Sequence, residues 1–92
     1  MNNISAINLL LDIHTTFSKL PVTFRELVSE NCDWSTPTFY RKMRGRDKPD
    51  PNNKGKILVA LSKAEKVAII KQAKIAVQEI SDFMAKLDQK EP

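Results

Sequence analysis

The apolar residues near the start of the chain recur every three or four positions, which is the spacing of one face of an α-helix. The residues on this face are Ile4, Ile7, Leu10, Leu11, Ile13, His14 and Phe17. The pattern predicts an amphipathic helix over residues 4–20, with Asn3 or Ser5 as its N-cap. Pro21 is expected to end this helix, because a proline pushes the residue before it out of the helical conformation.

A second, short helix is expected to begin at Thr23. Thr23 and Glu26 have the Thr-x-x-Glu spacing of a capping box, in which each side chain satisfies a free backbone amide of the other residue. The apolar residues that follow at helical spacing are Phe24, Leu27, Val28 and Cys32. This helix is predicted to end at residues 31–33, since asparagine and aspartate tolerate the left-handed conformation found at helix ends.

A third helix is predicted over residues 36–44. Ser35 or Thr36 can cap its start. Pro37 lies in its first turn, where the missing amide hydrogen costs no hydrogen bond. Gly45 is expected to end it.

The segment after this helix is predicted to be a loop, because residues 46–56 contain two prolines and several turn-forming residues. The apolar run over residues 57–61 that follows is compatible with two structures. It can be a short strand that closes a wing-like hairpin, or it can be the entry to a helix. The strand is the weaker alternative, because no partner strand is evident in the sequence.

A long helix is predicted over residues 62–88, because Ser62 and Glu65 form a second capping box and no Gly or Pro occurs between residues 64 and 91. Its apolar residues alternate spacings of four and three, the seam of a heptad repeat. They are Ile69, Ala73, Ala76, Ile80, Phe83 and Leu87. Two partners can cover this seam: the N-terminal helix of the same chain, packed antiparallel, or the same helix of a second subunit. We expect a homodimer, because a bare apolar strip is rare on soluble monomers. Its contact residues are predicted to be Ile80, Phe83 and Leu87.

Positive charge is concentrated in residues 35–56. This segment holds seven of the 15 Lys and Arg residues against two Asp residues, whereas the net charge of the whole chain is +4. The basic residues are Arg41, Lys42, Arg44, Arg46, Lys48, Lys54 and Lys56. A local excess of this size predicts contact with a polyanion.

Residues 23–45 have the length and the residue types of a helix-turn-helix motif. Ser29 supplies the small residue where the two helices cross, and Asp33 supplies the left-handed position of the turn. The apolar contacts between the helices are expected from Val28, Cys32, Trp34, Phe39 and Met43.

The recognition helix of tetracycline-repressor-like and Cro-like regulators opens with a Gly-Val-Ser-x-x-Thr-Phe-Tyr-Arg type of sequence. Residues 32–41 resemble it, reading Cys32-Asp33-Trp34-Ser35-Thr36-Pro37-Thr38-Phe39-Tyr40-Arg41. The chain departs from the pattern at Asp33, Trp34 and Lys42, where glycine, a branched aliphatic and an apolar residue are usual. The resemblance implies an all-α, single-domain helix-turn-helix protein over residues 1–92, of the small Cro-like kind. It also implies that the helix over residues 36–44 enters the major groove of DNA.

Sequence-specific binding of double-stranded DNA, as a small transcriptional regulator, is therefore the predicted function. The residues expected to contact DNA are Ser35, Thr36, Thr38, Tyr40, Arg41, Lys42, Arg44, Arg46 and Lys48. Arg41 can form two hydrogen bonds with a guanine, whereas Lys42 and the other basic residues are expected on phosphates. Tyr40 has two interpretations, a phenol that bonds a phosphate and a half-buried ring packed on the first helix. Met43 is expected to point inward in place of Lys42.

The sequence predicts no catalytic residue, metal site or cofactor. His14 and Cys32 have no partner residues at ligand spacing, and Cys32 is expected to be a small core residue. The longest apolar run has five residues, so no membrane span is expected. The N-terminus begins Met1-Asn2-Asn3 without a basic region, so no secretory signal is expected. We expect a cytoplasmic protein, associated with the nucleoid in a bacterium. The alternative function is a helical protein–protein interaction module that binds no nucleic acid.

Overall fold

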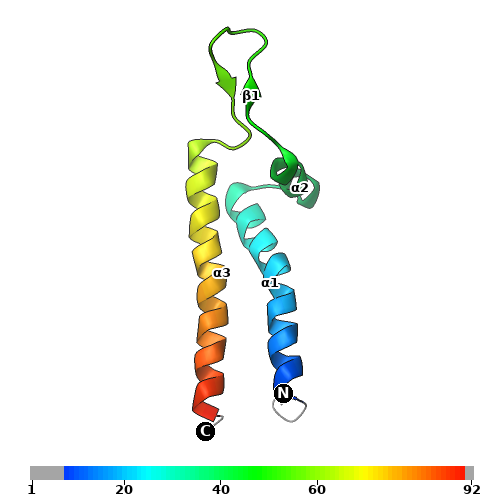
Figure 1. The fold of residues 1–92 in the computed structure, drawn as a ribbon, viewed down its shortest axis with the longest axis vertical. Coiled ribbons are helices and arrows are strands. Elements are labelled where there is room, and N and C mark those ends of the chain that lie inside the picture. The colour runs from blue at the N-terminus through cyan, green and yellow to red at the C-terminus, as the bar shows by residue number, and fades with distance from the viewer. Residues whose placement is uncertain (1–7, 91–92) are drawn as a thin grey trace.

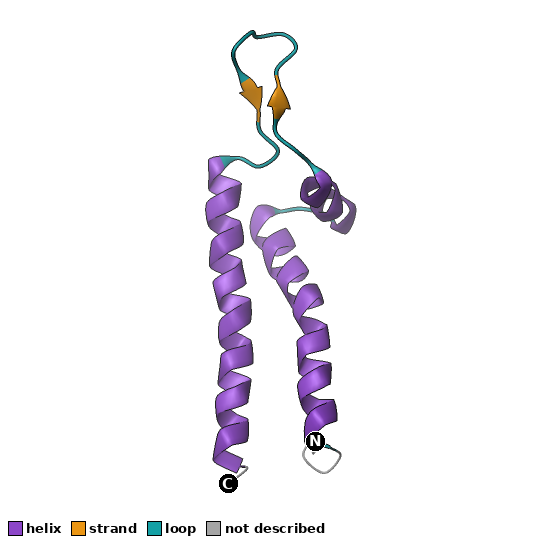
Figure 2. Ribbon diagram, in the orientation of Figure 1, coloured by secondary structure: helices purple, strands orange, loops and turns teal. Residues whose placement is uncertain are grey.

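Two long helices packed antiparallel form the body of the protein. The structure, a computed structural model, describes residues 8–90. Its elements in chain order are α1 (Leu9–Cys32), α2 (Thr36–Arg44), β1 (Lys48–Pro49), β2 (Ile57–Leu58) and α3 (Lys63–Lys90). The short helix α2 and the two strands lie at one end, and the start of α1 lies near the end of α3 at the other (Figure 1, Figure 2). The predicted all-α fold, with an N-terminal helix and a long C-terminal helix, is confirmed.

Helix α1 is continuous where the sequence predicts two helices. Pro21 lies inside it, so the prediction that Pro21 ends one helix and that Thr23 and Glu26 cap another is wrong. A proline inside a helix removes one backbone hydrogen bond and crowds the carbonyl four residues earlier. Leu20 and Phe24, on either side of the proline, line an apolar groove shared with α3. Packing against α3 thus keeps the chain helical across Pro21.

The two ends of α1 are capped by side-chain and backbone hydrogen bonds. The N-cap is Asn8, whose Oδ1 accepts the amides of Leu10 at 2.8 Å and Leu11 at 3.3 Å. The predicted caps Asn3 and Ser5, and the predicted helical residues 4–7, lie outside the described residues. At the other end Asp33 is left-handed, with φ of 58°, as the sequence predicts.

The seam of α3 packs against α1 of the same chain. Ala76 is 2% exposed, and the remaining seam residues are half-buried. Ile80 and Phe83 lie opposite Thr16 and Leu20 of α1, and Leu87 lies opposite Leu9 and Ile13. Of the two covers that the sequence leaves open, the antiparallel N-terminal helix is the one found, and Ile80, Phe83 and Leu87 contact it.

The start of α3 is fixed by the predicted capping box. The Ser62 amide donates to Glu65 Oε1 at 2.8 Å, and the Glu65 amide donates to Ser62 Oγ at 3.0 Å. The predicted box is confirmed, and so is the long helix, which extends two residues beyond its predicted end at residue 88.

Residues 48–58 form a β-hairpin, so the weaker alternative for residues 57–61 is the correct one. The strands are antiparallel, with Lys48 opposite Leu58 and Pro49 opposite Ile57. The partner strand is missed from sequence because it is two residues long and contains a proline, which edge strands tolerate.

The hairpin loop is organised by one aspartate. The Asp50 carboxylate accepts the Asn52 amide at 2.8 Å and the Asn53 side-chain amide at 3.0 Å. Gly55 then adopts a φ of 83°, which glycine reaches without steric cost. Together these residues turn the chain back toward β2.

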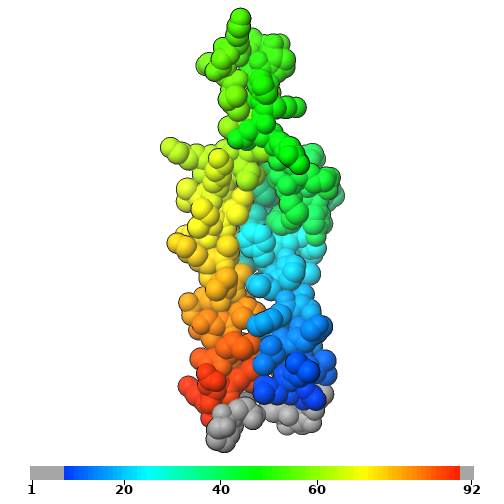
Figure 3. All heavy atoms as spheres, in the orientation of Figure 1, coloured from blue at the N-terminus to red at the C-terminus, as the bar shows by residue number. Residues whose placement is uncertain are grey.

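The molecule is elongated and has a small core. Its extents are 63 × 21 × 20 Å and its radius of gyration is 18.6 Å, whereas a compact chain of this length has a radius of gyration of about 12 Å. Figure 3 shows α1 and α3 side by side, with the hairpin extending beyond them. In the described part of the chain the buried apolar residues are Val28, Phe39 and Ala76. Large apolar side chains therefore remain on the surface.

Candidate nucleic-acid interface

A three-residue turn joins α1 to α2 and sets the direction of α2. The turn begins at the left-handed Asp33, and the Trp34 amide donates to the Ser29 carbonyl at 2.8 Å. Ser35 is the N-cap of α2, and its Oγ accepts the Thr38 amide at 3.2 Å. Pro37 lies in the first turn. The bounds of α2, its cap and the position of its proline are those predicted from the sequence.

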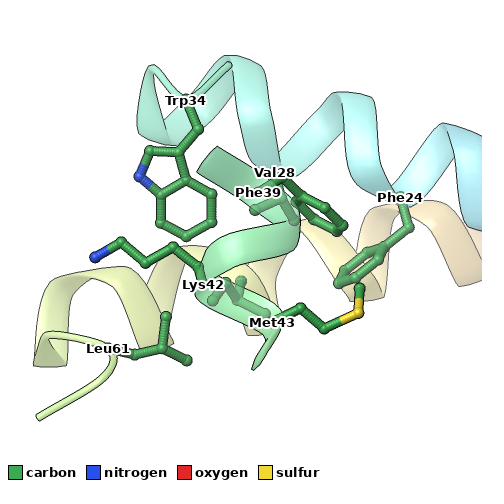
Figure 4. A pocket seen from close by; sticks show the side chains of 8 residues that line it. Phe24, Val28, Trp34, Phe39, Lys42, Met43 and Leu61 are labelled. Atoms are coloured by element: carbon green, nitrogen blue, oxygen red, sulfur yellow. The ribbon is translucent and has the colours of Figure 1, made fainter. Parts of the chain in front are cut away.

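Phe39 is the residue that anchors α2 on α1. It is 7% exposed, and its ring centroid lies 6.3 Å from that of Phe24 and 6.5 Å from that of Trp34. Figure 4 shows Phe39 beside Val28, with Phe24 and Met43 adjoining. Edge-on aromatic pairs of this kind add to the free energy gained by burial alone. The outward face of α2 is thereby held in a fixed orientation.

Ser29 lies in α1, one helical turn before the turn that leads to α2. Its hydroxyl oxygen is buried and, among the described residues, makes no hydrogen bond. Most buried polar atoms have a partner, so the hydroxyl itself contributes nothing favourable here. The buried oxygen leaves little space beside this position, where the motif predicts a small side chain.

Lys42 connects α2 to α3 and does not point outward. Its Nζ lies 3.3 Å from Glu65 Oε2 and 5.6 Å from the centre of the Trp34 ring. Met43, expected to point inward, lines the same pocket as Phe39 and Phe24 and remains 62% exposed. The expectation that Lys42 points outward is wrong, because Lys42 follows Phe39 by three residues and so shares its buried side of the helix.

The Glu65 carboxylate caps α3 and also pairs with Lys42 of α2. Its hydrogen bond from the Ser62 amide, followed by the bond from Lys42, lowers the pKa of Glu65. The charged carboxylate is therefore the form that holds α2 against the start of α3.

Tyr40 packs on α1 by way of an arginine. Arg25 Nη1 donates to the Tyr40 hydroxyl oxygen at 3.2 Å, and the Tyr40 ring meets the Phe39 ring edge-on at 5.2 Å. Of the two interpretations of Tyr40, the packing one describes its contacts in the structure. The residue is still 38% exposed, at the margin of the outward face of α2.

The outward face of α2 carries arginines. Pro37, Arg41 and Arg44 follow one another at spacings of four and three and are all exposed. Arg41 Nη2 donates to Thr38 Oγ1 at 3.4 Å. Ser35 and Thr36 are exposed at the N-terminus of α2, whereas Thr38 is half-buried.

The hairpin adds three exposed basic residues, and the segment between α2 and the hairpin adds Arg46. These elements lie at the same end of the molecule (Figure 1). These four residues and the two arginines of α2 form what we call the basic end: Arg41, Arg44, Arg46, Lys48, Lys54 and Lys56. The two aspartates of this segment are engaged internally. Asp47 accepts the Ala60 amide at 2.9 Å, and Asp50 holds the hairpin loop. The hydrogen bonds from Asn53 and Asn52 lower the pKa of Asp50.

The sequence prediction missed three residues that position this end. Asp47 ties the base of the hairpin to the segment before α3, Arg25 supports Tyr40, and Glu65 receives Lys42. The spacing of Ser62 and Glu65 gave a signal for the last of these. No sequence signal marks the other two, because their partners are 13 and 15 residues away.

Residues 8–90 hold no cluster of metal ligands and no activated thiol. No group of three or more His, Cys, Asp or Glu side chains within that range is arranged to hold a metal ion. Burial, followed by the nearby Glu65 charge, raises the pKa of the Cys32 thiol. A thiol with a raised pKa is a poor nucleophile at neutral pH. Across the same residues, no helix combines the length and apolar character needed to cross a membrane. Comparison of the chain with protein-family models, with curated proteins and with solved structures finds no match.

Proposed function

We propose that this protein binds double-stranded DNA sequence-specifically, as a small transcriptional regulator, with α2 in the major groove. The observation that carries the proposal is the basic end, in which six exposed Lys and Arg residues belong to α2, to the hairpin and to the segment between them. These elements lie at one end of the molecule (Figure 1). Positive side chains on phosphates supply most of the non-specific affinity of DNA-binding proteins.

Helix α2 has the dimensions and the side chains of a groove-reading element. Its nine residues are about 13 Å long at 1.5 Å per residue, and its outward face carries Arg41 and Arg44. Arg41, in the middle of that face, reads a base edge through two hydrogen bonds to guanine. Arg44, closer to the hairpin, contacts a phosphate. Ser35 and Thr36 bring small hydroxyls and the positive end of the helix dipole toward a second phosphate.

The hairpin acts as a wing that contacts the DNA backbone beside α2. Lys48, Lys54 and Lys56 are exposed along it, and they add phosphate contacts that carry no sequence information. Because a two-stranded hairpin is only marginally stable alone, its attachment through Asp47 sets where these lysines meet the DNA.

Lys42 has a positioning role in this scheme. Its ammonium pairs with Glu65, so it holds α2 in place and makes no phosphate contact of its own. A DNA-binding regulator works in the cytoplasm, on the nucleoid in a bacterium.

Fluorescence anisotropy on duplex DNA, over a range of salt concentrations, tests the proposal. We expect log affinity to fall linearly with log salt, and selection from genomic fragments near physiological salt to enrich a defined site. Absence of binding to any duplex at low salt would contradict DNA binding and favour a protein-interaction module. Binding without enrichment of any site would contradict sequence-specific binding.

A further inference from the structure

One side of the α1–α3 pair is apolar, and within residues 8–90 it is covered only at one edge, where Phe39 of α2 packs on Phe24. We call it the open face and define it by six residues, Phe17, Pro21 and Phe24 of α1 and Ile70, Ala73 and Val77 of α3. Phe17, Ile70 and Val77 are 51%, 57% and 61% exposed.

These residues lie on one continuous surface. Pro21, Phe24, Ala73 and Val77 line a single groove between the two helices. Ala73 and Val77 also line a second hollow with Ile70 on α3. Phe17 precedes Phe24 by seven residues, which places it on the same side of α1.

We propose that the open face binds the open face of a second copy of this chain, giving a symmetric four-helix bundle. The two-fold axis runs parallel to the helices. This dimer is inferred from the apolar face alone and does not rest on DNA binding.

The open face is the apolar centre of a larger side of the α1–α3 pair. The 24 residues of α1 span about 36 Å, and two helices side by side are about 20 Å wide, so this whole side measures about 700 Å². The six apolar residues occupy about 12 Å of that length, at eight residues of each helix. Interfaces of standard size bury about 800 Å² on each partner. Burial of this area also enlarges the small core of the elongated monomer, which small domains need for stability.

The face complements itself under the proposed symmetry. A two-fold axis parallel to the helices sets α1 of one chain against α3 of the other, antiparallel as they are within the chain, and keeps each residue at its height along the axis. Because Phe24 and Pro21 share a groove with Ala73 and Val77, they lie at the same height as these residues of the second copy. The large Phe24 ring then meets the small Ala73 and Val77 side chains.

The mass in solution is the first test. Sedimentation equilibrium or light scattering at micromolar concentration should give the mass of two chains, each of 10.5 kDa. A mass of one chain across the micromolar range would overturn the proposal and leave the face to a different protein partner.

A pair of matched variants identifies the surface. Val77→Glu should halve the mass while helical circular dichroism is retained, because the side chain is already exposed in the monomer. Ile75→Glu is the control, since Ile75 is 38% exposed and lies two residues before Val77, on the opposite side of α3, and it should stay dimeric. A Val77→Glu protein that remains a dimer would overturn the proposal. If Phe83→Glu alone dissociates the dimer, the contact belongs instead to Ile80, Phe83 and Leu87.

A distance measurement tests whether the two-fold axis is parallel to the helices. A spin label on Asn53→Cys, with Cys32→Ser to remove the native thiol, reports the separation of the two hairpin tips. The proposed axis places both tips at one end, so their separation should not exceed about twice the 20 Å thickness of one chain. A separation greater than the 63 Å length of one chain would place the tips at opposite ends and overturn the arrangement.

Discussion

The Lys42 ammonium lies 3.3 Å from the Glu65 carboxylate, and this ion pair joins the buried side of α2 to the first turn of α3. Both side chains are less than a third exposed, so solvent screens the pair less than it does a surface pair. The two residues are 23 positions apart in the sequence. The hairpin lies in the segment between them. The position of α2 therefore depends on α3 as well as on α1.

We predict that Glu65→Ala lowers stability more than Lys42→Ala does. Removing Lys42 loses the ion pair, worth about 1 kcal/mol at most for a partly exposed pair. Removing Glu65 also loses the capping box, for a total of about 1–2 kcal/mol. Urea denaturation of both single variants and the double variant measures the difference and the coupling. Equal losses for the two single variants would show that the capping box contributes nothing.

The lowered pKa of Glu65 predicts loss of stability in acid. The pKa is lower in the folded chain than its ordinary value of 4.5, so the carboxylate stabilises the fold fully above that value. This contribution is lost as the pH falls below 4.5 and through the lowered pKa. Glu65→Gln should therefore narrow the difference between urea midpoints at neutral pH and in acid. Glu79→Gln, at an exposed position of the same helix, is the control. If Glu65→Gln loses as much stability in acid as the unchanged protein does, Glu65 does not contribute to the pH dependence of stability.

We expect Ser29→Ala to stabilise the protein by about 1 kcal/mol, because it removes a buried hydroxyl without a partner and raises helix propensity. Ser18→Ala, in the same helix, is the control: its hydroxyl donates to the His14 carbonyl at 2.8 Å and is exposed. Ser29→Leu should destabilise, since α2 leaves little space there. Thermal unfolding separates the three variants. A lower melting temperature for Ser29→Ala would mean that the hydroxyl does have a favourable contact.

Arg41→Ala should change the DNA sequence preference of the protein. Lys48→Ala and Lys54→Ala should instead weaken binding to all duplexes and reduce the salt slope by about one unit each. The difference arises because an arginine in the groove reaches base edges, whereas hairpin lysines reach phosphates. Anisotropy with the selected site and with random duplex measures both effects, and Lys71→Ala on the exposed side of α3 is the control. If Arg41→Ala leaves the ratio of affinities for the selected site and for random duplex unchanged, α2 does not lie in the major groove.

Local signals explain which elements could be predicted from the sequence. The bounds of α2 follow from Ser35, Pro37 and Gly45, and the start of α3 follows from Ser62 and Glu65, all within a few residues of one another. Pro21 shows the limit of such signals, because its place inside α1 depends on packing against α3. The hairpin shows it too, since strands of two residues have no pattern of their own.

The residue types of the candidate site could be predicted from the sequence, whereas the directions of individual side chains could be predicted less well. The basic residues of segment 35–56 are evident in the sequence, and most are exposed in the structure. Lys42 was expected to point outward because it is charged, whereas its spacing of three residues from Phe39 and its ion pair with the Glu65 carboxylate turn it inward.

Substitutions on the two sides of α2 have different effects. Phe39 and Lys42 fix the helix from its inner side, while Pro37, Arg41 and Arg44 stand on the outer side without a share in the core. Substitutions at these outer positions can alter what the helix recognises at little cost in folding free energy. Under the proposed function, variants with new target sites, whether evolved or selected from a library randomised at residues 37, 41 and 44, can thus arise on an unchanged scaffold.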